Sequence, residues 1–319
     1  LEERRDNPKG AVGALERYLT LVTTPEEKTS LARRLADLYQ GPLNDPRGAI
    51  RALEVVHASD ADDLDAISRL VELCESVEQW ERTAELLKTL VDVEGDTEEQ
   101  SKLSIRRALI LCDRLERGQD ALAALETLAD EGNEACRETY VELGDKLNFK
   151  GIVAMKLRDW YAMSSGEKQH EAFRGAFERF MEMGRDSDAA QMAVELIRAK
   201  GQTPEIVQQL EVLATRLKDL DALSAAHDTM VRELSGPDRA VEYVRQSEIL
   251  VQAGVEPAEA VQHGEQGLTS VSPADVEPLL ERLSGILSTP GQIVDLYERQ
   301  VGRCKNPNDR LLALARGAQ

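Results

Sequence analysis

Aromatic side chains are scarce in this sequence, at 4% of its 319 residues. Sheet sandwiches and barrels draw heavily on aromatic and β-branched residues, so this scarcity argues against an all-β fold. The chain relies instead on Ala, Leu, Glu, Arg and Gln, which are strong helix formers. We therefore expect a helical protein, with 42% apolar and 31% charged residues to form its core and its solvated face.

Positive charge is also in short supply. Lys and Arg number 39 against 59 Asp and Glu, which gives a net charge of −20. Such an acidic surface repels the phosphates of nucleic acids and of anionic membranes, so both are poor candidates as partners. The same charge favours the long-range attraction of basic partners.

Long apolar runs and secretion signals are missing as well. No stretch of about 18 apolar residues is present to span a bilayer, and no charged-then-apolar leader precedes the first helical pattern. The sequence begins at Leu1 in the middle of a pattern, which we interpret as a fragment of a longer protein. The four cysteines form no CxxC pair and fit no zinc spacing, so a reducing, cytoplasmic setting is the simplest interpretation.

Sequence signatures of catalysis are absent too: there is no P-loop, GxGxxG, HExxH, GxSxG or calcium loop. We predict no enzymatic activity, no cofactor and no metal. The acidic stretch 60–65 is interpreted as a helix N-terminal cap, and Cys74 and Cys112 as buried small hydrophobes. His57 and His263 are expected at helix ends or turns.

What the sequence does contain is a repeat. Residues 8–16 read PKGAVGALE, residues 46–54 read PRGAIRALE, and residues 121–126 read ALAALE. Small residues at i and i+3 with a large apolar residue at i+4 place one narrow stripe on a helix. The first small residue of this stripe serves as a marker, and its equivalents are Ala11, Ala49, Thr83, Ala121, Ala154, Ala189, Ala222, Ala260 and Ile293.

The markers are spaced by 33 to 38 residues, with a mean of (293 − 11)/8, or about 35. Between them lie other amphipathic helices, of which 64–75 and 204–217 are examples. We predict an all-α fold, a right-handed α-solenoid of about eight antiparallel helix pairs, forming a single domain over 1–319. The repeats are best formed at 29–200 and degenerate at 203–319, and the uneven spacing predicts unequal loop lengths.

The helix pairs resemble the tetratricopeptide repeat (TPR) family. One unit has Leu35, Ala36 and Tyr39 in its first helix, and Ala49 follows in the second helix. The closest copy of the first-helix motif has Tyr140, Leu143, Gly144 and Leu147. The resemblance implies a concave surface lined mainly by first helices and a role in binding proteins. HEAT-type helix pairs remain an alternative.

Arginines on the first helices form one group of candidate binding residues. Aligning the units places Arg33, Arg106 and Arg174 at one groove-facing position and Arg34, Arg69 and Arg107 at the next. Such a ladder could grip an acidic partner. The competing interpretation is pairing within a helix, of Arg33 with Asp37 and of Arg174 with Glu178. Arg106 and Arg107 are then the least neutralised, and the lysine and asparagine set of the family's carboxylate clamp is missing.

A second group lies in 149–192, which is rich in aromatic residues and methionine. Phe173, Phe177 and Phe180 are expected in the core. Trp160, Tyr161 and Met163 are the candidates for an exposed binding surface.

The sequence therefore predicts a non-enzymatic scaffold that binds a peptide or a partner helix in a groove. Two other possibilities stay open. The repeats could be a regulatory region attached to an enzymatic or DNA-binding domain, or a structural array that self-associates through its ends.

Overall fold

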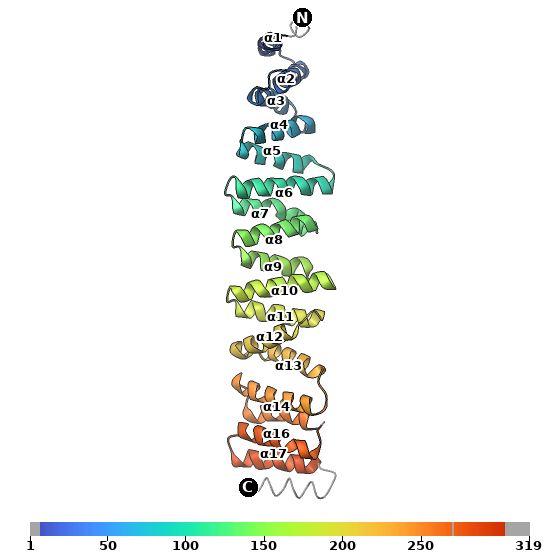
Figure 1. The fold of residues 1–319 in the computed structure, drawn as a ribbon, viewed down its shortest axis with the longest axis vertical. Coiled ribbons are helices and arrows are strands. Elements are labelled where there is room, and N and C mark those ends of the chain that lie inside the picture. Colours follow the sequence, from blue (N-terminus) through green and yellow to red (C-terminus); the bar gives the residue numbers. More distant parts are fainter. Residues whose placement is uncertain (1–6, 270, 304–319) are drawn as a thin grey trace. The chain divides into compact units, whose positions relative to one another are not determined.

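The computed structural model describes residues 7–269 and 271–303, and within them the chain forms 17 α-helices and no strand (Figure 1). The prediction of an all-α fold is confirmed. Contacts divide the chain into two compact units, residues 1–149 and residues 150–319. Both units contain the same type of helix pair. No helix of the described part is long and apolar enough to cross a membrane.

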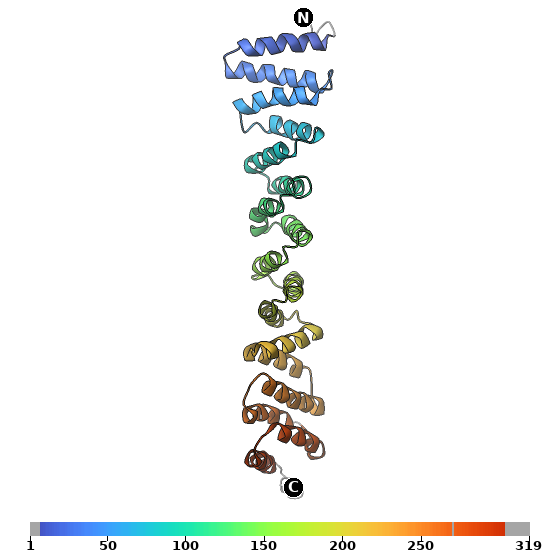
Figure 2. The ribbon, with the colours of Figure 1, turned by 90° about the vertical axis from the view of Figure 1, so that its left-hand side faces the viewer.

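The helices of unit 1 are α1 (Pro8–Leu21), α2 (Pro25–Gln40), α3 (Pro46–Ser59), α4 (Leu64–Ser76), α5 (Trp80–Val93), α6 (Thr97–Asp113), α7 (Gly118–Asp130) and α8 (Glu134–Lys146). Those of unit 2 are α9 (Lys150–Tyr161), α10 (Glu167–Glu182), α11 (Asp186–Ala199), α12 (Pro204–Leu217), α13 (Leu220–Arg232), α14 (Gly236–Gln252), α15 (Pro257–Leu268), α16 (Pro273–Ile286) and α17 (Pro290–Arg303). Within each unit, consecutive helices pack side by side (Figures 1 and 2).

Every marker residue lies in an odd-numbered helix, so the odd-numbered helices are the second helices of the pairs and the even-numbered ones are the first helices. The eight markers from Ala11 to Ala260 are buried, and Ile293 is half-buried. The repeat that the sequence predicts is therefore present from α1 to α17. The C-terminal repeats fold as helix pairs as well, although they fit the sequence pattern poorly.

Small residues allow the paired helices to approach closely. A Cβ atom on Gly48 of α3 would lie 2.4 Å from Cδ1 of Tyr39 in α2. In the α14–α15 pair, a Cβ atom on Gly267 would lie 2.9 Å from the Cα of Ala240. These distances are too short for any side chain, and the second involves backbone, which cannot move aside. A larger residue would therefore force the Tyr39 side chain to move at the first contact and the α14 backbone to move at the second.

The uneven repeat spacing comes mainly from helix length and not from loop length, which corrects the prediction. The three 38-residue steps contain the first helices α2, α6 and α14, which have 16, 17 and 17 residues. The steps of 33 or 34 residues contain α4, α8, α12 and α16, which have 13 or 14 residues. The difference is about one helical turn of 3.6 residues. A longer repeat therefore has a longer first helix, and its two helices still form a pair.

Many turns inside the pairs share one geometry. Residues with positive φ end the first helix, among them Glu78, Asn148 and Lys218. The amide of Gln79 donates to the carbonyl of Cys74 at 2.8 Å, which is the six-to-one bond of a Schellman turn. This turn satisfies the last carbonyls of the first helix and reverses the chain into the second.

Unit 2 has two clusters of buried apolar residues. One runs from α9 to α14 and includes Phe173, Phe177 and Phe180, so the expectation that these three belong to the core is confirmed. The other runs from α14 to α17. Helix α14 contacts both clusters: Ile249 packs against the first, and Val244 belongs to the second. The junction between the α12–α13 and α14–α15 pairs thus lies where one apolar cluster gives way to the other.

Close packing at the markers can be tested by enlarging one of them. Ala49 in α3 is fully buried, so Ala49→Leu should overpack the α2–α3 contact and lower the free energy of unfolding by about 1–3 kcal/mol. Ala58 lies exposed on the same helix, so Ala58→Leu is the matched control and should change it by less than about 0.5 kcal/mol. Urea unfolding measures the free energy of unfolding of both variants. Equal losses in the two would contradict the close packing at the marker Ala49.

Candidate functional site

Two arginines of the proposed ladder are paired with carboxylates of the neighbouring first helix. Arg69 of α4 donates to Asp37 of α2 at 2.8 Å. Arg106 of α6 donates to both carboxylate oxygens of Glu75 in α4, at 2.9 and 2.6 Å. Arg106 is therefore neutralised across the repeat boundary, contrary to the sequence interpretation.

Arg33 and Arg107 are engaged as well. Arg33 pairs with Asp63 at the start of α4 and not with Asp37 of its own helix, so the expected intrahelical pair is wrong. Arg107 is half-buried, and its Nε donates to the carbonyl of Ala84 at 3.2 Å. Burial lowers the pKa of Arg107 below its usual range. Most of these side chains therefore link repeats, and their charge is already countered.

Arg174 of α10 differs from these residues. Its Nε is buried and has no hydrogen-bond partner among the described residues, and the expected pair with Glu178 does not form. Arg174 lies in a cleft of about 370 Å³ between α10 and α12. Phe177, Met181 and Ile206 give this cleft an apolar part, while Glu178, Glu182 and Glu205 make its lining acidic.

The other candidates lie at the end of α9 and in the turn that follows it. Trp160 is half-buried, with the ammonium of Lys156 5.9 Å from its ring centroid. Tyr161 is half-buried, and its carbonyl accepts a hydrogen bond from Gln169. Met163 is 98% exposed. None of the three lines the α10–α12 cleft.

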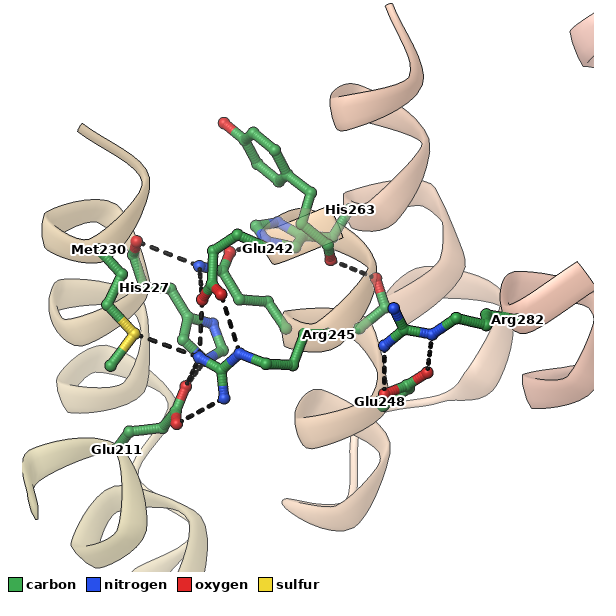
Figure 3. Close-up of polar contacts among 11 residues, drawn as sticks. Glu211, His227, Met230, Glu242, Arg245, Glu248, His263 and Arg282 are labelled. Carbon is green, nitrogen blue, oxygen red and sulfur yellow. Dashed lines mark hydrogen bonds and ion pairs between the residues drawn. The ribbon is translucent and has the colours of Figure 1, made fainter. Parts of the chain in front are cut away.

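A partly buried polar network joins α12, α13 and α14, and sequence analysis did not single it out (Figure 3). Arg245 of α14 donates to both oxygens of Glu211 in α12, at 2.8 and 2.7 Å. It also donates to both oxygens of Glu242 in its own helix, at 2.9 and 2.6 Å. His227 of α13 lies with its Nε2 3.1 Å from Glu211 Oε1. One guanidinium is thus shared by two carboxylates.

The network continues into α15. Gln246 donates to the carbonyl of His227 at 3.2 Å, and its side-chain oxygen lies 3.0 Å from Nε2 of His263 (Figure 3). His263 sits in the middle of α15 and not at a helix end, which corrects the sequence interpretation, whereas His57 does lie in the last turn of α3. A continuous chain of polar contacts therefore crosses the junction between the two apolar clusters.

Burial and charge act in opposite directions on the carboxylates. Burial alone would raise the pKa of Glu211, but the hydrogen bonds from His227 and Arg245 outweigh it and bring the pKa to about 2. The pKa of Glu242 is also lowered, because Arg245 outweighs burial there. The two carboxylates in turn raise the pKa of Arg245. Burial, followed by the charge of His227, lowers the pKa of His263. Both carboxylates are thus ionised at neutral pH.

The network lines a second cleft. A cavity of about 600 Å³ lies between α12, the end of α13 and α14, with Glu211, Glu242 and Arg245 among its lining residues. Pro204, Val207, Val212, Met230 and Leu234 form its apolar part. This arrangement can hold a side chain of a partner. It offers no activated nucleophile, and no group of three or more His, Cys, Asp or Glu suited to a metal occurs within residues 7–269 and 271–303.

The remaining sequence candidates have structural roles. Cys74 and Cys112 are buried, as predicted, and so is Cys136; Cys304 lies outside the described residues. Burial raises the pKa of Cys74 and of Cys136 to about 11, which keeps these thiols protonated. Asp63 accepts a hydrogen bond from the amide of Ala66 and caps α4, which confirms its interpretation as a cap.

No protein-family model and no curated protein matches this sequence. The solved structures that match this chain include PilW, a widely conserved type IV pilus biogenesis factor, with 16% identity and a TM-score of 0.27 over 82% of this chain and 98% of PilW. A tetratricopeptide repeat protein from Parabacteroides merdae has 11% identity and a TM-score of 0.32 over 84% of this chain and 94% of its own. The structure of Naa15/Naa10 bound to HypK-THB has 14% identity and a TM-score of 0.35. The match covers 98% of this chain and 56% of the other. By its own helix pairs, this chain is a TPR-like helical repeat.

The pH dependence of stability tests whether Glu211 is ionised and paired in the folded state. The folded state depresses the pKa of Glu211 from 4.5 to about 2, so the stabilisation is present above pH 4.5 and is lost as pH falls towards 2. A shift of this size corresponds to about 3 kcal/mol. Glu211→Gln should therefore be less stable than the wild type at pH 6, and urea unfolding should show the difference shrinking towards pH 2. A difference that stays constant over this range would contradict the ionised pair.

Proposed function

We propose that this chain is a non-enzymatic scaffold that binds an extended segment or a helix of another protein along the first helices of unit 2. The observation that carries the proposal is the pair of clefts on either side of α12, one shared with α10 and the other with α14. Consecutive clefts along a row of parallel elements suit a ligand that presents side chains at regular intervals.

The lining of the clefts supports a protein ligand. Each cleft combines apolar side chains with charged ones, so it can hold a partner side chain that has both an apolar and a polar part. In the α10–α12 cleft, Arg174 is a lining residue whose Nε has no partner in the described part of the chain, so its guanidinium can donate to a carbonyl or a carboxylate of the bound segment. The polar groups of the α12–α14 cleft hold one another in place, which favours a preformed binding surface over a catalytic one.

The proposal narrows the prediction from the sequence. It keeps Arg174 and does not depend on Arg69, Arg106 and Arg107, which already bind neighbouring repeats or the backbone. Trp160, Tyr161 and Met163 become a separate candidate surface at the end of α9. The free, buried Cys74, Cys112 and Cys136 are compatible with a reducing compartment, which supports a cytoplasmic setting as part of the proposal.

Occlusion of the clefts tests the proposal. Peptides selected for binding to the full chain from a displayed random library should lose affinity for Gln208→Trp and Gln209→Trp. These two exposed positions of α12 line the α14 side and the α10 side, respectively. A bulky ring there should reduce affinity about tenfold or more by excluding the peptide side chain.

Gln262→Trp is the matched control, because Gln262 is exposed on α15 and lines neither cleft. Its affinity, measured by fluorescence polarisation, should equal that of the wild type. Selected peptides that bind all three variants like the wild type would refute binding at these clefts.

A further inference from the structure

The α12–α14 cleft has polar groups that are mostly hydrogen-bond acceptors. Glu211 and Glu242 are held at its wall by Arg245, and Glu233 lies exposed among its lining residues. Carboxylates accept hydrogen bonds and donate none when ionised. The guanidinium that could donate is directed at Glu211 and Glu242, with its Nη2 also 3.2 Å from Sδ of Met230 (Figure 3).

A further acceptor, on a residue that lines the same cleft, has no donor. The side-chain oxygen of Gln202 is buried and has no hydrogen-bond partner in the described part of the chain, and Gln202 is one of the lining residues. A buried acceptor without a partner costs free energy that a donor from a ligand can recover. This oxygen is independent of the carboxylates and points to the same kind of ligand, one that donates hydrogen bonds.

The net charge of the cleft favours the same kind of ligand as its hydrogen-bond acceptors do. Its charged lining residues are Glu211, Glu233, Glu242 and Arg245, which leave an excess of two negative charges. A carboxylate excess in a partly enclosed space attracts a cation more strongly than the same charges do on an open surface. The net charge of −20 on the whole chain adds long-range attraction in the same direction.

The apolar part of the cleft favours a cation that carries an apolar stem. Val207, Val212, Met230 and Leu234 lie among the lining residues with the carboxylates, so a ligand meets apolar surface as well as charge. Lysine and arginine have this form, since an apolar stem carries a charged end with several donors. A bare metal ion does not use the apolar wall.

We propose that the α12–α14 cleft binds a cationic side chain, lysine or arginine, of the protein segment held by unit 2. The inference rests on the proposed function, because it takes the cation from a bound protein segment. The stem packs on the apolar wall, the charged end lies beside Glu242 and Glu233, and the oxygen of Gln202 accepts one of its hydrogen bonds.

The test uses n-hexylammonium as the probe, because it has the stem and the charge of lysine. The full chain is labelled with ¹³C at the methionine methyl groups and titrated by NMR. Met230 is the methionine that lines this cleft, whereas Met155 and Met163 are exposed elsewhere and report non-specific binding. The Met230 resonance should shift to saturation with n-hexylammonium, while hexan-1-ol and hexanoate should leave it in place.

Two variants with the same change of net charge decide whether the site is local. Glu233→Gln removes an exposed charge of the cleft and should weaken n-hexylammonium binding about fivefold. Glu259→Gln removes an exposed charge on α15, outside the cleft, and should leave the affinity unchanged. Three results would overturn the proposal: a Met230 resonance that does not shift with n-hexylammonium, an equal shift with hexan-1-ol, or an equal loss of n-hexylammonium affinity in the two variants.

The outcome separates the two proposals. If Gln208→Trp blocks a selected peptide but Met230 does not respond to n-hexylammonium, the cation site is wrong and the scaffold function stands. If Met230 responds as expected but Gln208→Trp and Gln209→Trp leave peptide binding unchanged, the scaffold function is wrong and the cleft is a cation site alone.

Discussion

A helix pair of this size cannot bury its own apolar stripe, so each pair depends on the next one along the chain. The buried small residues at the marker positions make this packing possible, because Ala49, Ala121 and Ala189 allow neighbouring helices to approach closely. The same requirement explains how repeats of different length coexist. A longer repeat adds a turn to its first helix, as α6 and α14 do, and leaves the close contact at the marker unchanged.

Ion pairs follow the same period as the apolar contacts. Arg106 reaches Glu75, Lys146 reaches Asp113 and Arg282 reaches Glu248, each about one repeat away in the sequence. Pairs as exposed as these contribute only about 0–1 kcal/mol each, so they fix the alignment of adjacent repeats more than their stability. The Glu211–Arg245 pair differs because Glu211 is only 8% exposed and lies at the junction of two apolar clusters. There the polar network takes the place of apolar packing and leaves a cleft beside it.

The helix pairs could be predicted because their signal is local. Small and apolar residues at helical spacing, with proline at positions such as Pro46, define a helix without knowledge of its neighbours. The ion-pair partners could not be found this way. Arg33 has Asp37 one turn away and Asp63 in the next repeat, and only the folded chain, which brings the N-cap of α4 to Arg33, selects Asp63. Glu211 and Arg245 are 34 residues apart and look like ordinary charged residues of an acidic chain. The burial of Glu211 and its pairing with Arg245 are properties of the fold.

The central claim is that a partner segment lies across the first helices of unit 2, on either side of α12. Hydrogen–deuterium exchange of the full chain, with and without a saturating selected peptide, tests it most directly, because ligand contact slows the exchange of the backbone that it covers. The account predicts slower exchange in α10, α12 and the first half of α14, with α2, α4 and α6 unchanged. Slower exchange confined to unit 1, or to the second helices of unit 2, would contradict it.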